Sequence, residues 1–311
     1  MTSDPSIGKS SDPQDPKNEP INYIAEIRRM MYGFGDCPEP LFESAKIIED
    51  VIHRQMRSLV CKACDVAERR NSKIVTDEDF VFLLRGNKIK LRRLLKYLEI
   101  KEFKASVNKT LEAESFDESL EDLTENPLKK KRSHNRIVGL IDNTGELSDG
   151  RSAIDRVKHN RRLRAEMMSR KIDEARYMDY SRARCISFAN RNQHKFSDWI
   201  GCEGDTKVSK QGYVVLGYLA YETVAEIIDL ALLVRQDQNK IHGDSIERLK
   251  LSYHNPYTYK PYQHSKGTVT KPILPAEINE ALRRYWSPQL DITGPFHRWS
   301  VHRPHLKLLS C

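Results

Sequence analysis

Few residues in the sequence have the types and the spacing that catalysis or metal binding requires. The run Gly8-Lys9-Ser10 is similar to the end of a phosphate-binding loop, but Ser3 stands where that loop needs its first glycine. Cys61 and Cys64 have the spacing of zinc ligands, but no second pair follows at a zinc-site distance. The HExxH, GxGxxG and GxSxG patterns do not occur. We therefore expect a protein with no enzymatic activity, no cofactor and no metal site.

Three acidic residues within an apolar stretch are the clearest candidates for a binding site. Glu222 and Glu226 are four residues apart and Asp229 follows three residues later, so all three share one face of a helix. A carboxylate on an apolar helix is costly unless it is paired. In one interpretation these acids face solvent or pair within the fold with nearby arginines: Arg235, Arg283 or Arg284. In the other, at least one of them contacts a basic protein partner.

Two basic stretches are weaker candidates. A helical pattern after the first ordered half carries five basic residues: Lys88, Lys90, Arg92, Arg93 and Lys96. They could meet DNA phosphates, although a solvated face or a docking surface for an acidic neighbour is the simpler explanation. A second run resembles a nuclear-import signal, although four basic residues in a row also arise by chance. That run is Lys129, Lys130, Lys131 and Arg132.

The composition indicates a helical chain with a limited core. Of the 311 residues, 39% are hydrophobic and 31% are charged, which argues against collagen-like, mucin-like and wholly disordered chains. No run approaches the roughly 18 apolar residues that a membrane span needs, and the polar first twenty residues are not a secretory signal. The six cysteines are too few for a disulfide framework. A net charge of +8 favours nucleic acid, an acidic partner, or both.

Charge also divides the sequence into segments. Residues 84–104 hold eight Lys and Arg against two Glu, and residues 151–184 hold eleven against five acids. Between them, residues 112–125 contain seven acids and no base, which is typical of a charged linker. We expect a disordered tail at 1–20, an ordered half with a basic helix at 21–104, a charged linker at 105–150, a basic helical segment at 151–184, a second ordered half at 185–290 and a tail at 291–311.

The first ordered half predicts a short helix, a long helix and a short capped helix. Ile21–Tyr32 and Leu41–Arg70 carry apolar residues at helical spacing. Thr76 precedes Asp79 by three residues, a variant of the capping box that opens a helix. This order is the plan of a histone fold, and Lys73–Phe80 looks like the second loop and third helix of a core histone. The alternative is an ordinary three-helix bundle. Because a histone fold is half a domain, this plan predicts a partner, inside or outside the chain.

The second ordered half repeats the same order with a longer second loop. Phe196–Ile200 can form a short helix, and Tyr213–Lys240 carries an apolar stripe with a mean spacing near 3.6 residues. Pro275 opens a last helix over Ala276–Trp286, because proline is tolerated in the first helical turn. The predicted fold class is therefore all-α, with two histone folds forming a pair within one chain.

Five strings along the sequence resemble one known family in the same order. They are Ala25–Asp36, Leu91–Tyr97, Leu219–Ala225, Asp229–Asp237 and Ala281–Tyr285. Together they are similar to the suppressor-of-Ty three family, over roughly 21–104 and 180–290. Members of that family carry two histone folds in one chain, and the halves resemble TBP-associated factors thirteen and eleven of TFIID. This sequence departs from the family mainly in the linker, at about 241–272 and after Pro288.

The resemblance implies a nuclear, non-enzymatic coactivator subunit of the SAGA complex. It implies TATA-binding protein (TBP) and other histone-fold and core SAGA subunits as partners, with TBP helped onto RNA polymerase II promoters. It implies no membrane and no small-molecule substrate, and at most weak or indirect contact with DNA. Because TBP is basic, we expect the acids Glu222, Glu226 and Asp229 to be the contact residues.

A histone-fold DNA-binding subunit of another nuclear complex is the alternative. The two hypotheses differ in where charge acts. TBP binding predicts sensitivity at carboxylates, whereas DNA binding predicts sensitivity at Lys and Arg with a steep dependence on salt.

Overall fold

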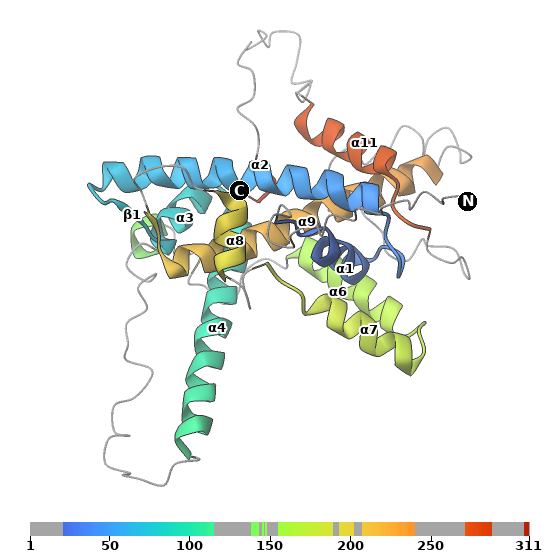
Figure 1. Ribbon diagram of the computed structural model, residues 1–311, viewed down its shortest axis with the longest axis horizontal. Helices are drawn as coiled ribbons and strands as arrows, with labels where there is room; N and C mark the ends of the chain where they lie inside the picture. Colours follow the sequence, from blue (N-terminus) through green and yellow to red (C-terminus); the bar gives the residue numbers. More distant parts are fainter. Residues whose placement is uncertain are drawn as a thin grey trace, which may run out of the picture.

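The structure is a computed structural model that describes residues 21–114, 138–142, 145, 147, 155–188, 193–201, 207–239, 271–287 and 308–310. The expected tail at 1–20 and the basic run Lys129–Arg132 lie outside these residues. Figure 1 shows a central body built on two long helices, α2 and α9, which cross each other. The described chain belongs to the all-α class, and it contains two histone folds that form a pair.

The first histone fold has the helices that the periodicity predicted, with shifted ends. α1 begins at Ile24 rather than Ile21, and it ends where Gly35 adopts a left-handed backbone with φ 116°. This conformation favours glycine, and it lets the N–H groups of residues 35 and 36 bond to the last carbonyls of α1. Its elements in chain order are α1 (Ile24–Phe34), α2 (Phe42–Arg69), β1 (Ile74–Val75) and α3 (Asp77–Leu83).

The second histone fold repeats this order. Pro275 is the first residue of its last helix, where the missing N–H has no intrahelical partner to lose. Its elements are α8 (Gln193–Ile200), β2 (Lys207–Val208), α9 (Lys210–Asn239) and α11 (Pro275–Trp286). The apolar stripes of α2 and α9 lie in one continuous core, which α1, α8 and α11 also enter.

The loops of the two folds meet at both ends of the pair. At one end β1 and β2 run parallel, with Ile74 opposite Lys207 and Val75 opposite Val208. At the other end, the Ile273 N–H donates to Asp36 over 2.8 Å and the Ser44 hydroxyl donates to the Ile273 carbonyl over 2.7 Å. The β1–β2 contact and the Asp36–Ile273 contact each join the second loop of one fold to the first loop of the other, and Ser44 adds a bond from the first turn of α2. Each fold therefore contributes its second loop at one end of the pair and its first loop at the other end.

Each fold also contains a salt bridge at the start of its third helix. Arg70, at the end of α2, lies 2.8 Å from Asp79 in the first turn of α3, and Asp79 accepts the Thr76 N–H to complete a capping box. In the second fold, Arg235 of α9 lies 2.6 Å from Glu277 in the first turn of α11. Each pair fixes the start of the third helix against the long helix of its own fold.

The segment between the folds differs from its sequence-based description. A basic helical segment was expected over 151–184, and it forms two helices, α6 (Arg156–Ser169) and α7 (Glu174–Arg184), which both lie against α1 (Figure 1). The Tyr32 and Tyr180 rings are 5.1 Å apart, and a Cβ at Gly33 would approach the Ala183 carbonyl oxygen to 3.2 Å. Glycine at position 33 thus permits the close contact between α1 and α7. The charge pattern of residues 151–184 did not indicate this contact, because it depends on a few small and aromatic residues such as Ala183 and Tyr180.

Two further boundaries are corrected. The helix α4 (Lys88–Glu114) continues ten residues into the range expected to be linker, since no glycine or proline interrupts residues 105–114. The expected C-terminal tail contributes Leu308 and Leu309 to the core, where the Leu309 N–H donates to Gln55 over 3.0 Å. The short 3₁₀ turn η1 (Leu84–Gly86) joins α3 to α4.

The shared core predicts that the first half does not fold alone. We expect an isolated fragment of residues 21–114 to aggregate or self-associate, because the stripe of α2 would lose the cover that α9 provides. Coexpression with residues 155–311 as a separate chain should recover a soluble one-to-one complex. Gel filtration with light scattering measures both, and a stable monomeric fragment would contradict the intramolecular pair.

The loop contact at Asp36 predicts a dependence of stability on pH. Burial raises the pKa of Asp36 to about 6, although the N–H groups of Cys37 and Ile273 and the charge of Arg235 act in the opposite direction. Between about pH 4 and pH 6, the folded state holds a proton that the unfolded state has released. Folding stability contributed by Asp36 therefore falls as the pH rises through this window and is level above it.

The variant Asp36→Asn lacks this titration but keeps an oxygen that can accept both N–H bonds. We expect its stability relative to the natural chain, measured by urea unfolding, to increase from pH 4 to pH 6 and then stay constant. Parallel pH profiles of the two proteins would show that Asp36 does not titrate in this range.

Candidate interaction site: an acidic row held by arginines

The acids singled out in the sequence lie together on α9, and they face basic residues from two other helices. We call Glu222, Glu226 and Asp229 the acidic row. Opposite it lie Arg161 and Arg164 of α6 and Arg93 of α4, which we call the arginine clasp. The clasp therefore joins the second fold to the two helices that follow the first fold along the chain.

Asp229 lies at the buried end of the acidic row. It is 4% exposed, and its two oxygens accept from Arg161 Nε over 2.6 Å and from Arg164 Nη2 over 2.5 Å. Burial alone would raise the pKa of Asp229, but the two guanidinium groups outweigh burial and hold the pKa below its ordinary value. The carboxylate is thus ionised and doubly paired.

Arg164 also connects the row to the first fold. Its Nε donates to the carbonyl of Phe34, the last residue of α1, over 2.7 Å. The C-terminal carbonyls of a helix carry partial negative charge, so a buried guanidinium is favourable there. One arginine of α6 therefore bridges α1 of the first fold and α9 of the second.

Glu222 is the more accessible end of the row, with 20% of its side chain exposed. It lies 2.8 Å from Arg161 Nη1 and 3.4 Å from Arg93 Nη1. Arg93 in turn donates to both oxygens of Asp155, which caps the N-terminus of α6 by accepting the Lys158 N–H. Arg93 thus sets the start of α6 against α4.

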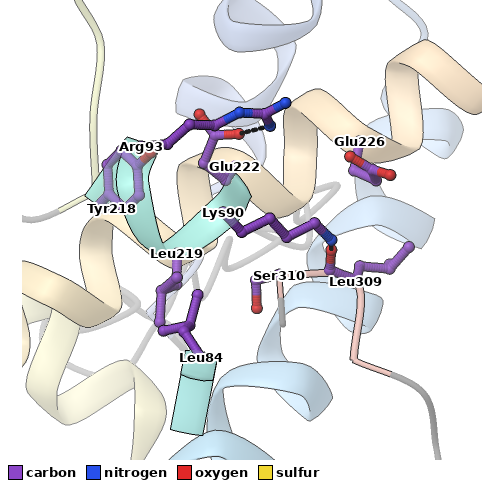
Figure 2. A pocket seen from close by; sticks show the side chains of 9 residues that line it. All are labelled: Leu84, Lys90, Arg93, Tyr218, Leu219, Glu222, Glu226, Leu309 and Ser310. Atoms are coloured by element: carbon purple, nitrogen blue, oxygen red, sulfur yellow. Dashed lines mark hydrogen bonds and ion pairs between the residues drawn. The ribbon is translucent and has the colours of Figure 1, made fainter. Parts of the chain in front are cut away.

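Glu226, in the middle of the row, has the weakest pairing. Burial raises the pKa of Glu226 above its ordinary value, and Lys90 and Arg161 oppose the rise without cancelling it. Arg161 Nη2 is 3.5 Å from its carboxylate. Figure 2 shows Glu226 at the edge of a small pocket in which Lys90 donates to the Leu309 carbonyl. The pocket is also lined by Leu84, Arg93, Tyr218, Leu219, Glu222 and Ser310.

Some known proteins match most of the chain, and others match about a third of it. The family model for the 18-kDa subunit of transcription initiation factor IID matches residues 21–113. SAGA complex subunit Spt3 of Schizosaccharomyces pombe is 28% identical over 88% of this chain and 92% of its own length. Spt3 of Drosophila melanogaster is 28% identical over 87% of this chain and 69% of its own length. TFIID subunit 13 of Dictyostelium discoideum is 34% identical, over 31% of this chain and 89% of its own length.

The Spt3 matches cover 87–88% of the chain and therefore include both histone folds, whereas the match to the TFIID family model ends at residue 113. The chain belongs to the suppressor-of-Ty three (Spt3) family. The resemblance of the five short strings is thereby confirmed. For an Spt3-family chain, the placement of the acidic row between α4, α6 and α9 is the feature that needs a functional explanation.

The sequence-based partners of the acidic row were wrong. Arg235 pairs with Glu277 and not with the row, and Arg284 pairs with Asp237 and Glu280. Arg283 also pairs with Glu280. The side chains of these three arginines are therefore engaged around α11, and the row receives its positive charge from the segment between the folds.

The five basic residues of α4 do not form one surface. Arg93 is 7% exposed and belongs to the clasp, and Lys90 is half-buried against Leu309. Lys88 and Lys96 are exposed, while Arg92 is half-buried. These five residues therefore do not form one continuous basic face for DNA, because some make internal contacts and the others lie at separate surface positions.

The clasp arginines of α6 were missed as site residues, although a signal exists. Arg161 and Arg164 are three residues apart, so they share a helix face, as the acids of the row do. Two helices with complementary charges at matching spacing are candidates for a contact. Because residues 151–184 contain eleven basic residues, charge alone did not distinguish the two that contact the acidic row.

Among the described residues, the cysteines and other possible metal ligands do not form a site. Of the two cysteines with the spacing of zinc ligands, Cys61 is exposed and Cys64 is half-buried on α2, and neither forms a disulfide. Within the described ranges, no group of three or more His, Cys, Asp and Glu is arranged to hold a metal ion. No helix of the described part is long and apolar enough to cross a membrane.

The burial of Asp229 predicts a large effect of its removal. Asp229→Ala leaves two buried guanidinium groups without their shared partner, and loss of one member of a buried ion pair costs about 3–5 kcal/mol. The matched control is Asp179→Ala on α7, because the side chains of Asp179 and its partner Arg182 are both 74% exposed. Its cost should stay below about 1 kcal/mol. Urea unfolding measures both, and equal effects would contradict a buried clasp.

Proposed function

We propose that this Spt3-family chain is a non-enzymatic coactivator subunit of a SAGA-type complex that binds TBP and helps to deliver it to RNA polymerase II promoters. The observation that carries the proposal is the match over 87–88% of the chain to proteins named SAGA complex subunit Spt3. Relatives that match about a third of the chain are named subunits of transcription initiation factor TFIID, which supports a role in transcription. The nucleus is the corresponding location.

The fold supports a role as a built-in histone-fold pair. Because each fold covers the other, the chain needs no second histone-fold protein to close its core. Its outer surfaces are therefore available to other SAGA subunits as partners. Membership of a larger complex fits a protein whose site consists of ion pairs and not of a cavity for a small molecule.

Within this proposal, we assign the direct contact with TBP to the Glu222 end of the acidic row. Glu222 has the largest exposed fraction of the three side chains, at 20% against 10% for Glu226 and 5% for Asp229. We assign Asp229 an indirect role, since it holds the α6 arginines in place. A basic partner would then approach a carboxylate of α9 that an arginine of α6 holds in place, and DNA contact would be weak or indirect.

The test is titration of the purified full chain with TBP at physiological salt, with a DNA duplex titrated in parallel. Glu222→Lys should weaken TBP binding by at least about tenfold, because it places a positive charge against a basic partner. The matched control is Asp65→Lys, the same charge change at an exposed position of α2. Equal affinities of natural chain and both variants would reject Glu222 as a contact.

Binding to DNA with no binding to TBP would support the alternative function instead. In that case affinity should fall steeply with salt, and substitutions of Lys and Arg should weaken it more than Glu222→Lys does. If Asp229→Ala weakens TBP binding and Glu222→Lys does not, the contact would lie on a surface of α6 and not at Glu222.

A further inference from the structure

Residues 308–310 make a contact with the body that the functions above do not use. We call these three residues the strap. Residues 288–307 separate the strap from the end of the preceding described range, yet Leu308 and Leu309 are only 6% and 1% exposed and lie in the shared core. The strap is therefore a short segment that returns to the body from a distant point in the sequence.

Three helices supply polar side chains that hold the main chain of the strap. We call Gln55 of α2, Lys90 of α4 and Tyr285 of α11 the slot. Gln55 Oε1 accepts the Leu309 N–H over 3.0 Å, and Lys90 donates to the Leu309 carbonyl. The Tyr285 hydroxyl donates to the Leu308 carbonyl over 3.0 Å. Main-chain bonds combined with buried side chains are the way in which proteins bind peptide ligands. The strap is thus held as a peptide ligand would be.

The fit between the strap and the slot is incomplete. Gln55 is fully inaccessible, but its Nε2 finds no hydrogen-bond partner among the described residues, and neither does Ser310 Oγ. Unpaired buried polar atoms disfavour the docked state, whereas water can reach these groups once the strap is released. Burial of two leucines is also opposed by the entropy cost of ordering the segment. The docked and released states are therefore close in free energy.

The strap also covers part of the acidic row. Leu309 and Ser310 line the small pocket that Glu226 lines too, and Figure 2 shows Lys90 extended toward Leu309 within this group. Only 10% of the Glu226 side chain is exposed, and burial is the main reason why its pKa is raised. The cations that face Glu226 are Lys90 of α4 and Arg161 of α6. Without the strap, water would reach Glu226 and favour its ionised form.

We propose that the strap is a reversible, autoinhibitory cover: it binds the slot in cis, and its release exposes Glu226 beside Glu222 to a basic partner. These two carboxylates are one helical turn apart on α9, so together they attract a basic surface more strongly than Glu222 alone. The inhibitory role rests on the proposed function, whereas the cover itself does not.

The first test is chemical labelling of carboxyl groups in the full chain, with the labelled positions identified by mass spectrometry. In the natural chain, Glu226 should react more slowly than Glu222, since the strap covers it. Leu309→Asp places a charge at a buried position and should release the strap, so the labelling of Glu226 should rise to the rate of Glu222. The matched control is Leu140→Asp, the same change at a side chain that is 73% exposed, and it should leave the labelling unchanged.

A synthetic peptide with the sequence of residues 305–310 separates release from unfolding. Added to the Leu309→Asp variant, it should dock in the vacant slot and return the labelling of Glu226 to the natural level. The labelling of Asp229 should stay low throughout, because two guanidinium groups hold this carboxylate. Tyr285→Phe removes one bond to the strap and keeps the ring, so it should give an intermediate rate at Glu226. Unchanged labelling in both variants, or a rise that the peptide does not reverse, would overturn the proposal.

The second test compares the TBP affinities of the same proteins. Release by Leu309→Asp should strengthen TBP binding by about tenfold, because a second carboxylate joins Glu222. Leu309→Asp combined with Glu226→Gln should return the affinity to that of the natural chain. Equal TBP binding by the natural chain and the Leu309→Asp variant would overturn the inhibitory role and leave the proposed function intact. Absence of TBP binding in every protein would instead reject the proposed function, and the labelling would still decide whether the strap covers Glu226.

Discussion

The structure depends on the burial of two long apolar stripes that neither histone fold can cover alone. α2 and α9 cross and bury their stripes together, with Ile52, Met56 and Ala231 fully inaccessible. The crossing brings the first loop of each fold against the second loop of the other, which gives the β1–β2 bridge at one end and the Asp36–Ile273 contact at the other. Because the core is shared, the loops, the caps and the intervening segment are all positioned by the same crossing.

The acidic row follows from this arrangement. One side of α9 packs in the shared core, and the opposite side would carry buried carboxylates without partners if α6 and α4 did not supply arginines. The segment between the folds therefore completes the site and links α1 to α9 through Arg164. Glu222, at the accessible end, is where this internal network meets the surface.

The sequence predicted the helices well because their apolar residues recur with helical periodicity, and Thr76 with Asp79 marked a helix start through local bonding alone. It could not predict the partners of the acidic row. Arg161 is 61 residues from Glu222, and only the fold brings them together. The same holds for Leu309, which bonds to Gln55 across 254 residues and carries no local sign of burial. Local patterns thus define elements, whereas long-range pairing decides which charges form a site.

The most direct test of the intramolecular pair is cleavage of the full chain between its halves. A protease site inserted near residue 126 would be cut after the chain has folded, and light scattering with gel filtration would give the mass of the product. We predict one particle of 36.1 kDa that contains both fragments and stays together until urea unfolds it. Separation of the fragments without denaturant, or a particle of twice that mass, would contradict a core shared within one chain.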